Sequence, residues 1–209
     1  MVHCPGPFEI RVELLKKIKN RVRGLKQKWG SATAKRELWN KEFAEGRWDK
    51  IEDTSGDVTY RFVEKYAANG SILDLGCGSG NTSCELDARS YADYLGVDIA
   101  DVALEKARAR SRALQREAKN SYVQGDIESF EPGKKFDVIL FRESIYYVPN
   151  SRIKGTLEKY SRFLTGRGVI IVRLHGKEQG NGLLHLLELG RTTVEKHVPE
   201  TGPVVFVLR

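Results

Sequence analysis

Three glycines follow a short apolar run in the stretch Leu73-Asp74-Leu75-Gly76-Cys77-Gly78-Ser79-Gly80. Glycine has no Cβ and accepts a positive φ, so a turn of this kind lets the backbone approach a ligand closely. The dinucleotide fingerprint needs its third glycine at the position of Asn81, whereas the glycines here are spaced G-x-G-x-G. The stretch therefore predicts a cofactor-binding turn and argues against NAD.

A carboxylate ends the next apolar run, in Tyr94-Leu95-Gly96-Val97-Asp98, about twenty residues after the turn. A carboxylate at this place can accept hydrogen bonds from both hydroxyls of a ribose. The alternative is that Asp98 caps the helix that begins near Ala100. Two further segments follow, Gly125-Asp126-Ile127 and Phe136-Asp137-Val138-Ile139-Leu140-Phe141.

In order and spacing, these four segments resemble the class I S-adenosylmethionine-dependent methyltransferases, over about residues 57 to 175. The resemblance implies that the glycine turn lies against the methionine part of S-adenosylmethionine, that Asp74 supports its ammonium, that Asp98 holds the ribose, and that Asp126 with Ile127 brackets the adenine. The cofactor-binding residues that the resemblance implies are Asp74, Gly76, Cys77, Gly78, Asn81, Asp98, Ile99, Gly125, Asp126, Ile127 and Arg142.

The segment Arg142-Glu143-Ser144-Ile145-Tyr146-Tyr147 follows the fourth expected strand and is the most informative about the methyl acceptor. It lacks the Asn/Asp-Pro-Pro-aromatic tetrad of nucleic-acid amino-methyltransferases, which argues against nucleic acid as the acceptor. It resembles the Glu-x-Leu-Tyr-Tyr-Leu segment of nodulation-factor N-methyltransferases. That resemblance implies a small-molecule acceptor, either a sugar, an amino sugar or another small polar metabolite. We expect Tyr147 in the pocket wall and Tyr146 in the core.

Two residues are candidates for a general base in methyl transfer to oxygen or nitrogen. Glu143 follows the fourth strand directly, where its carboxylate can reach an acceptor. His175 follows the run Val169–Leu174, and histidine titrates near neutral pH. His185 and His197 are expected to be structural. The catalytic residues expected from the sequence are Glu143, His175 and Tyr147. No metal ligands are expected.

Apolar runs alternate with helical patterns beyond residue 71, which predicts the elements that position these residues. The expected strands are 72–75, 94–97, 122–123, 138–141, 169–174, 192–198 and 204–208, and the main helices between them are 100–117 and 151–164. Continuous apolar runs are typical of parallel strands that are buried on both faces. The pattern predicts a Rossmann-like α/β sandwich with a mostly parallel seven-stranded sheet and a C-terminal antiparallel strand.

The chain is predicted to divide into a basic helical appendage and lid, residues 1–56, and a methyltransferase domain, residues 57–209. Residues 1–50 carry thirteen Lys and Arg against six Asp and Glu, so they hold the whole net charge of +7. Residues 8–29 and 33–45 read as helices, and a third helix is expected over 57–68. The first is amphipathic, because Leu15, Ile18, Val22, Leu25 and Trp29 share one face. It packs on the body, or it contacts an anionic membrane surface or an acidic partner.

The three cysteines, Cys4, Cys77 and Cys84, have no metal-ligand spacing and cannot all pair in disulfides. Together with the absence of a long apolar run, this favours a soluble protein in a reducing cytoplasm. Cys77 is expected to be a small residue whose backbone N–H faces the cofactor rather than a reactive thiol.

Two other functions stay open at this point. The chain is either an enzyme or a methyltransferase-fold protein that binds S-adenosylmethionine without transferring its methyl group, because fold does not fix function. An RNA methyltransferase that holds phosphates with the basic arm is the other alternative, and it predicts RNA affinity that depends steeply on salt.

Overall fold

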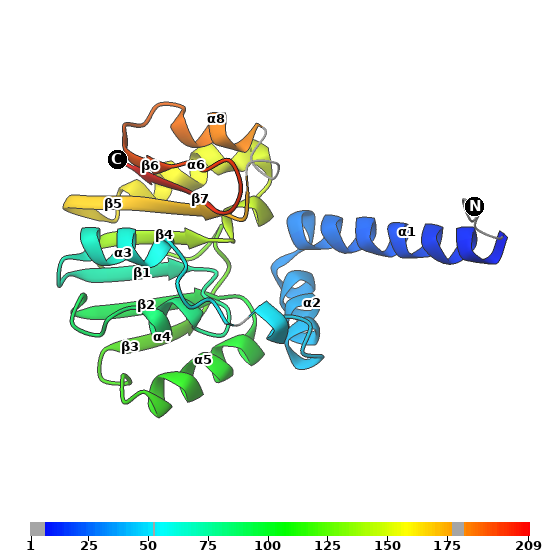
Figure 1. Cartoon of the computed structure of the whole chain (residues 1–209), viewed down its shortest axis with the longest axis horizontal. Helices are drawn as coiled ribbons and strands as arrows, with labels where there is room; N and C mark the ends of the chain where they lie inside the picture. The colour runs from blue at the N-terminus through cyan, green and yellow to red at the C-terminus, as the bar shows by residue number, and fades with distance from the viewer. Residues whose placement is uncertain (1–6, 52, 177–181) are drawn as a thin grey trace.

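A seven-stranded sheet forms the centre of the structure, a computed structural model that describes residues 7–51, 53–176 and 182–209 (Figure 1). The strands follow the order β3-β2-β1-β4-β5-β7-β6. They are β1 (Ser71–Leu75), β2 (Asp93–Asp98), β3 (Asn120–Gln124), β4 (Phe136–Arg142), β5 (Leu164–Leu174), β6 (Thr193–His197) and β7 (Val204–Leu208). Strands β1 to β5 pair in parallel, and β7 is antiparallel to both β5 and β6. The predicted sheet and its antiparallel closing strand are confirmed.

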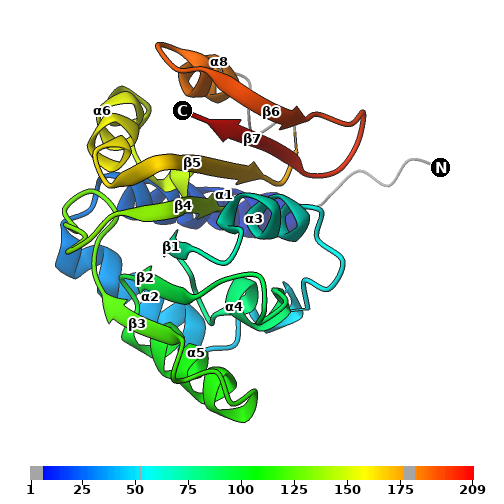
Figure 2. The same cartoon turned by 90° about the vertical axis from the view of Figure 1, so that its left-hand side faces the viewer.

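Helices cover both faces of the sheet (Figure 2), which is why residues 138–141 of β4 are apolar and buried without interruption. Along each strand the side chains alternate between two hydrophobic cores, one on each face of the sheet. One core joins the sheet to α6 (Asn150–Ser161) and α8 (Leu183–Glu188), and the other joins it to α3 (Thr59–Ala67) and α5 (Asp101–Ala113). A short helix, α4 (Asn81–Glu85), follows the glycine turn.

Several boundaries differ from those expected. Helix α5 ends at Ala113 rather than near residue 117, and Gln115, two residues later, has a φ of 55°, which no helix continues through. Strand β5 begins at Leu164, inside the stretch expected to be helical. The short elements α4, α8, η1 (Asp49–Ile51) and η2 (Ile145–Tyr147) were not expected, because so few residues show no periodicity.

Two further helices precede α3, and the second of them packs closely on α5. Helix α1 (Pro7–Trp29) extends away from the body (Figure 1). Helix α2 (Ala32–Ala44) begins at Ser31, whose Oγ accepts a hydrogen bond from the N–H of Ala34 at 3.2 Å. It packs against the start of α5 through Phe43. Among the described residues, no helix combines the length and apolarity needed to cross a bilayer.

The strand order reverses direction between β1 and β4. The chain proceeds outward from β1 to β2 and β3, then returns to the other side of β1 with β4 and β5. The helices that follow β1 and β4 therefore leave to opposite faces of the sheet, which opens a crevice outside the carboxyl ends of these strands. Ligands bind at such switch points in open α/β sheets, and the glycine turn lies at this one.

Candidate active site

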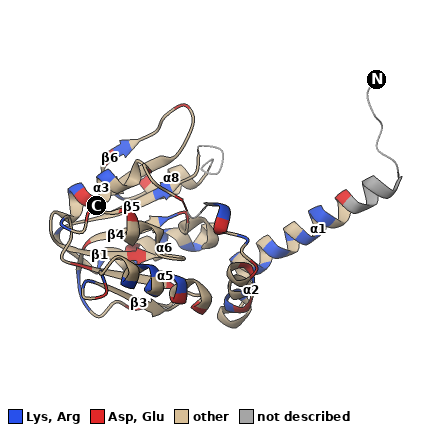
Figure 3. Cartoon of the chain, turned by 60° about the horizontal axis from the view of Figure 1, so that its bottom comes forward, with Lys and Arg blue, Asp and Glu red and all other residues tan. Residues whose placement is uncertain are grey.

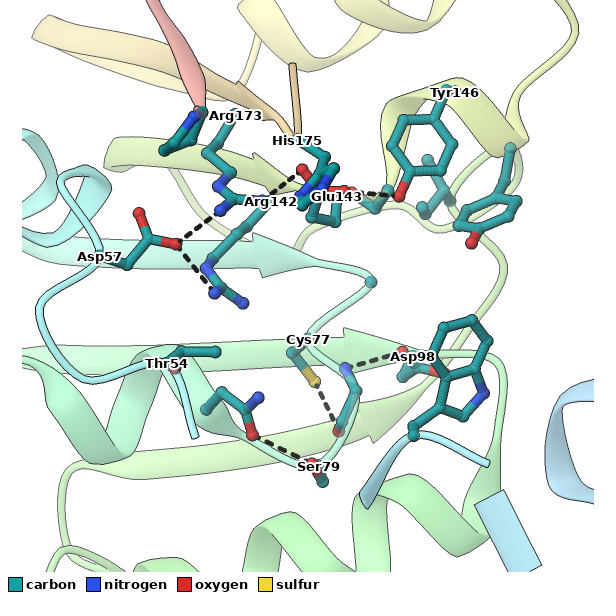
Figure 4. Close-up of a pocket in the computed structure, with 18 of the residues that line it drawn as sticks. Thr54, Asp57, Cys77, Ser79, Asp98, Arg142, Glu143, Tyr146, Arg173 and His175 are labelled. Atoms are coloured by element: carbon teal, nitrogen blue, oxygen red, sulfur yellow. Dashed lines mark hydrogen bonds and ion pairs between the residues drawn. The ribbon is translucent and has the colours of Figure 1, made fainter. Parts of the chain in front are cut away.

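A cavity of about 1040 Å³ occupies this crevice (Figure 4). Its lining brings together residues from the ends of β1 to β5, from α2, and from the segment between β6 and β7. Of the site residues expected from the sequence, those that line it are Gly76, Cys77, Gly78, Asn81, Asp98, Ile99, Gly125, Asp126, Ile127, Arg142, Glu143, Tyr147 and His175. Asp74 alone does not.

The glycine turn is held against β2 by its own backbone. Gly76 and Gly78 have φ values of 82° and 53°, in the left-handed region that favours glycine. The N–H groups of Gly76 and Cys77 both donate to the carbonyl of Val97, at 2.8 and 3.1 Å. The expectation that the Cys77 N–H faces the cofactor is therefore wrong. Burial raises the pKa of the Cys77 thiol well above its ordinary value, which agrees with an unreactive side chain.

Asp98 joins the end of β2 to the turn and to the next helix. Its Oδ2 accepts the N–H of Gly78 at 2.8 Å, and its Oδ1 accepts the N–H of Ala100 at 2.9 Å. An ionised carboxylate has about four acceptor positions, so two remain for a ligand. Burial raises the pKa of this carboxyl, and 9% of the residue is exposed. The structure thus combines the two alternatives left open for Asp98, since it contacts the start of α5 and also lines the cavity.

Asp74 is enclosed beneath the turn rather than exposed to the cavity. It is 1% exposed and accepts a hydrogen bond of 2.5 Å from the Tyr94 hydroxyl at Oδ2. Burial raises its pKa to about 6, and within the described parts of the chain its Oδ1 has no hydrogen-bond partner. Its place in the middle of the sheet, behind Gly76, argues against a direct contact with a bound ammonium.

The loop after β3 forms the far end of the cavity. The carboxylate of Asp126 accepts the N–H of Glu128 at 2.8 Å and lies 3.5 Å from the Lys35 ammonium of α2. Lys35 also pairs with Glu128, at 2.8 Å. Ile127 reaches back to the turn, since its Cδ1 lies 3.5 Å from the position that a Cβ would take at Gly76. Helix α2 thus closes over the loop where the resemblance places the adenine.

Four charged residues form a linked network at the carboxyl ends of β4 and β5 (Figure 4). Asp57 Oδ2 accepts a hydrogen bond from Arg142 at 3.0 Å and forms an ion pair with Arg173 at 3.2 Å. Arg173 also donates to Oε1 of Glu143 at 2.5 Å, and the Tyr146 hydroxyl donates to Oε2 of Glu143 at 2.8 Å. Burial opposes ionisation of Asp57, but the Thr59 N–H and the two guanidinium groups outweigh it and lower its pKa.

Glu143 adopts a φ of 57°, which is uncommon for a residue with a side chain. Its neighbour Ser144 explains how this conformation is maintained. The Ser144 hydroxyl donates to the carbonyl of Leu75 at 2.5 Å, and a Cβ added at Gly76 would lie 2.5 Å from that of Ser144. The backbone after β4 is therefore packed directly on the glycine turn, and Glu143 is held beside it. Strain of this kind is concentrated at functional sites.

Aromatic rings form the wall on the side of α2. Trp39 contacts the ring of Tyr147 edge-on, with centroids 4.8 Å apart, and stacks at a tilt on Trp48 at 5.6 Å. Tyr146 lies 4.6 Å from Tyr147 by ring centroids; it packs against the hydrophobic core as expected, and it also lines the cavity. Burial raises the pKa of both tyrosines, which keeps their hydroxyls protonated at neutral pH.

The two histidines at the cavity come from different strands. His175, one residue beyond β5, is exposed and lines the cavity as expected. His197, the last residue of β6, lines it too, which corrects its assignment as purely structural. His185 is an exposed residue of α8 that does not line the cavity.

Sequence reasoning missed Lys35, Asp57, Arg173 and His197. Asp57 offered one signal, because an aspartate two residues before a helix is a common cap, and its Oδ1 does accept the Thr59 N–H at 2.9 Å. The other three belong to elements distant in the sequence, and no local pattern joins them to the turn.

The chemistry of the lining fits a ligand with several hydrogen-bond acceptors. Four buried N–H groups in cavity-lining side chains have no partner within the described residues. They are Nε2 of Gln27, Nε1 of Trp48, and Nε of Arg142 and of Arg173. Buried polar groups are nearly always satisfied, so these orphans and the free acceptor positions of Asp98 agree with a polar ligand. Across the described ranges, no group of three or more His, Cys, Asp or Glu could hold a metal ion.

Comparison with known proteins agrees with this fold. Residues 72–168 match a family model described as a methyltransferase domain. The chain is 28% identical over 123 residues to an mRNA cap guanine-N(7) methyltransferase of Schizosaccharomyces pombe, covering 52% of this chain and 34% of that one. It is 26% identical over 123 residues to 27-O-demethylrifamycin SV methyltransferase of Amycolatopsis mediterranei, covering 54% and 44%. The chain thus spans about a third to a half of the length of these curated relatives.

Solved structures share the fold at low sequence identity. The N-methyltransferase NodS of Bradyrhizobium japonicum, in complex with S-adenosyl-L-homocysteine, superposes with a TM-score of 0.67 at 16% identity, covering 83% of this chain and 97% of that one. Magnesium protoporphyrin IX methyltransferase of Synechocystis, also with the product bound, gives a TM-score of 0.66 at 15% identity and covers 86% and 100%. The fold is therefore that of these enzymes.

Proposed function

From the premise that residues 72–168 are a class I S-adenosylmethionine-dependent methyltransferase domain, we propose that this protein transfers a methyl group to an oxygen or nitrogen of a small polar acceptor. The acceptor class that we propose is a sugar or amino sugar. The likeness to the N-methyltransferase NodS, at 16% identity, supports the fold alone.

One observation carries the proposal more than any other. Ser144 packs on Gly76, so the polar end of β4 lies directly beside the cofactor turn. The carboxylate of Glu143, the hydroxyl of Tyr146 and the guanidinium of Arg173 are then joined by hydrogen bonds next to the place where a bound cofactor meets its acceptor. A methyl acceptor with hydroxyl or amino groups matches this polar surface.

The residues present would hold S-adenosylmethionine along the carboxyl ends of β1, β2 and β3. Asp98 has free acceptor positions for the ribose hydroxyls, the glycine turn allows close approach of the methionine part, and Asp126 with Ile127 borders the adenine. The cofactor supplies an electrophilic methyl group on a sulfonium. What the protein adds is position, exclusion of water and, where the acceptor needs it, a base.

Glu143 is our candidate for that base, and His175 is the alternative. An amine must lose a proton before it attacks, and a hydroxyl must lose one during attack. The Glu143 carboxylate is oriented by two donors, Arg173 and Tyr146, and each carboxylate oxygen keeps a further acceptor position. Tyr147, with Trp39 behind it, would wall the acceptor.

The direct test is transfer of a labelled methyl group from S-adenosylmethionine to a panel of sugars, amino sugars, amines and carboxylic acids. We expect labelled product with a sugar or amino sugar, and less of it with the Asp98→Ala variant when the cofactor concentration is limiting. Tight cofactor binding without transfer to any acceptor would instead favour a binding protein that retains the methyltransferase fold.

An RNA acceptor is the second candidate, because the basic residues of α1 are exposed. It predicts that the logarithm of the RNA-binding constant falls linearly with the logarithm of salt concentration. A gel-shift titration at low salt without a complex would exclude it.

We also propose that the protein is located in the cytoplasm and that its residues 1–56 act as a lid. Cys77 and Cys84 are free thiols, which suits a reducing compartment. Lys35, Trp39 and Phe43 of α2 line the cavity, so movement of α2 would open it.

A further inference from the structure

Helix α1 presents an apolar face to solvent. Within the part of the chain that the structure describes, six of its apolar side chains are between 49% and 58% exposed. They are Leu14, Leu15, Ile18, Val22, Leu25 and Trp29. At 3.6 residues per turn they fall within an arc of about 100°, so they form one continuous stripe along the helix.

The body contacts the opposite side of the helix. Gln27 is 5% exposed, and Arg23 forms an ion pair with Glu42 of α2 and lies over the Trp48 ring at 5.7 Å. Both residues point away from the apolar stripe on the helical wheel. The sequence suggested a helix packed on the body through its apolar face, and the structure shows the reverse. From Leu14 to Leu25 the stripe is exposed because the polar side is the one that packs, and at its end Trp29 meets the guanidinium of Arg152, 5.6 Å from the ring centroid.

Basic residues flank the stripe on both edges. Lys19 and Lys26 follow one edge, and Lys17, Arg21 and Lys28 follow the other. Glu13 is the one acidic residue between positions 13 and 29, and it lies on the polar side. Figure 3 shows basic residues spaced along the part of the helix that is drawn in colour.

This charge pattern selects among possible occupants of the stripe. Leu15, Ile18, Val22, Leu25 and Trp29 have coiled-coil spacing, which suggests a second copy of the chain. In such a pair the flanking positions would bring Lys and Arg of both helices together, and like charges there oppose pairing. A surface that is apolar inside and negatively charged outside complements both features.

We propose that α1 is a docking helix that lies in the interface of an anionic lipid bilayer. The apolar stripe enters the boundary between headgroups and acyl chains, while the flanking Lys and Arg side chains reach the anionic headgroups. The helix connects through Ser31 to α2, which lines the cavity, so docking places the active site close to the membrane surface. None of the stripe residues lines the cavity, so docking is separable from methyl transfer.

The test is co-sedimentation of the full-length protein with vesicles of phosphatidylcholine alone and of phosphatidylcholine with phosphatidylglycerol in equal amounts. We expect binding to the anionic vesicles, weak binding to the neutral ones, and loss of binding as salt is raised. Leu15→Ser/Ile18→Ser/Val22→Ser/Leu25→Ser is expected to abolish binding with cofactor affinity unchanged.

A charge variant with a matched control makes the test independent of how the apolar variant folds. Lys17→Gln/Lys19→Gln/Arg21→Gln should weaken binding to anionic vesicles by about 100-fold. Lys65→Gln/Arg89→Gln/Lys154→Gln removes the same charge from exposed positions on the body and should bind like the wild type.

Four results would overturn the proposal. Equal binding to neutral and anionic vesicles, or equal loss in both charge variants, would remove the role of the flanking cations. A wild-type dimer by light scattering that the apolar variant converts to a monomer would assign the stripe to a second copy. No binding to either vesicle would leave an acidic protein partner as the occupant in place of lipid.

Discussion

Arg142 and Arg173 lie side by side as paired residues of the adjacent parallel strands β4 and β5. Two like charges at neighbouring positions of a sheet repel each other. The carboxylate of Asp57 contacts both and is only 5% exposed, and together with Glu143 it balances the charge of two guanidinium groups that are themselves largely buried. The network that orients Glu143 therefore depends on a residue from outside the sheet.

Asp57→Asn should destabilise the protein strongly, since it leaves two buried cations with one carboxylate partner. We expect a loss of about 3–5 kcal/mol in the free energy of unfolding, measured by urea denaturation. Asp53→Asn is the matched control, because Asp53 is an exposed residue of the same segment whose carboxylate contacts Ser55. Because the pKa of Asp57 is lowered in the folded protein, its stabilising contribution to the free energy of unfolding is fully present above the ordinary pKa of 3.8. That contribution is lost as the pH falls through the pKa of the folded state. A variant as stable as the wild type at neutral pH would contradict this account.

Asp98→Ala should weaken S-adenosylmethionine affinity by about 1.5–3 kcal/mol, measured by calorimetry, because it removes the acceptor for the ribose hydroxyls. The control is Asp101→Ala, since Asp101 pairs with Arg36 and Asn40 and does not line the cavity. Asp98 also holds the Gly78 N–H, so thermal unfolding without cofactor should be recorded for both variants. Unchanged affinity would place the ribose elsewhere.

Asp74→Asn should stabilise the cofactor-free protein at neutral pH. Burial raises the pKa of Asp74 to about 6, so its favourable contribution is complete below the ordinary value of 3.8 and is lost as pH rises through about 6. Asparagine cannot ionise, so the free energy of unfolding of the variant, relative to that of the wild type, should rise by up to about 3 kcal/mol between about pH 4 and pH 7.5.

Urea unfolding at the two pH values measures the effect of Asp74→Asn. Asp87→Asn provides the control, because the pKa of the exposed Asp87 is lowered to about 2 by Arg89 and should give no pH-dependent difference across this range. A difference between Asp74→Asn and wild type that is constant with pH would show that Asp74 is ionised throughout.

Glu143→Gln should lower kcat by a factor of about 10² to 10⁴ if the carboxylate takes the proton from the acceptor, with cofactor affinity unchanged. The comparison is His175→Gln, which removes the other candidate base from the same cavity. Formation of S-adenosylhomocysteine, followed across pH, measures both. Tyr146→Phe tests the orienting hydroxyl and should lower kcat less than Glu143→Gln. Full activity of Glu143→Gln at every pH would show that Glu143 is not the general base and would favour His175 instead.

Much of the fold could be predicted because its signals are local. The apolar runs of β1, β2 and β4 are continuous since both faces are buried, and the glycines of the turn are required by positive φ values at Gly76 and Gly78. Asp98 could be placed because its distance along the chain from the turn is set by one strand, helix and strand.

What the sequence by itself determined is thus the sheet, the turn and the residues at the strand ends that line the cavity. Tertiary structure decided three further matters. It enclosed Asp74 beneath the turn, it joined Asp57 and Arg173 to Glu143, and it turned the apolar stripe of α1 to solvent. The physical reason is the same in each case. Periodicity defines which residues share a face, but only packing between distant elements decides what that face meets.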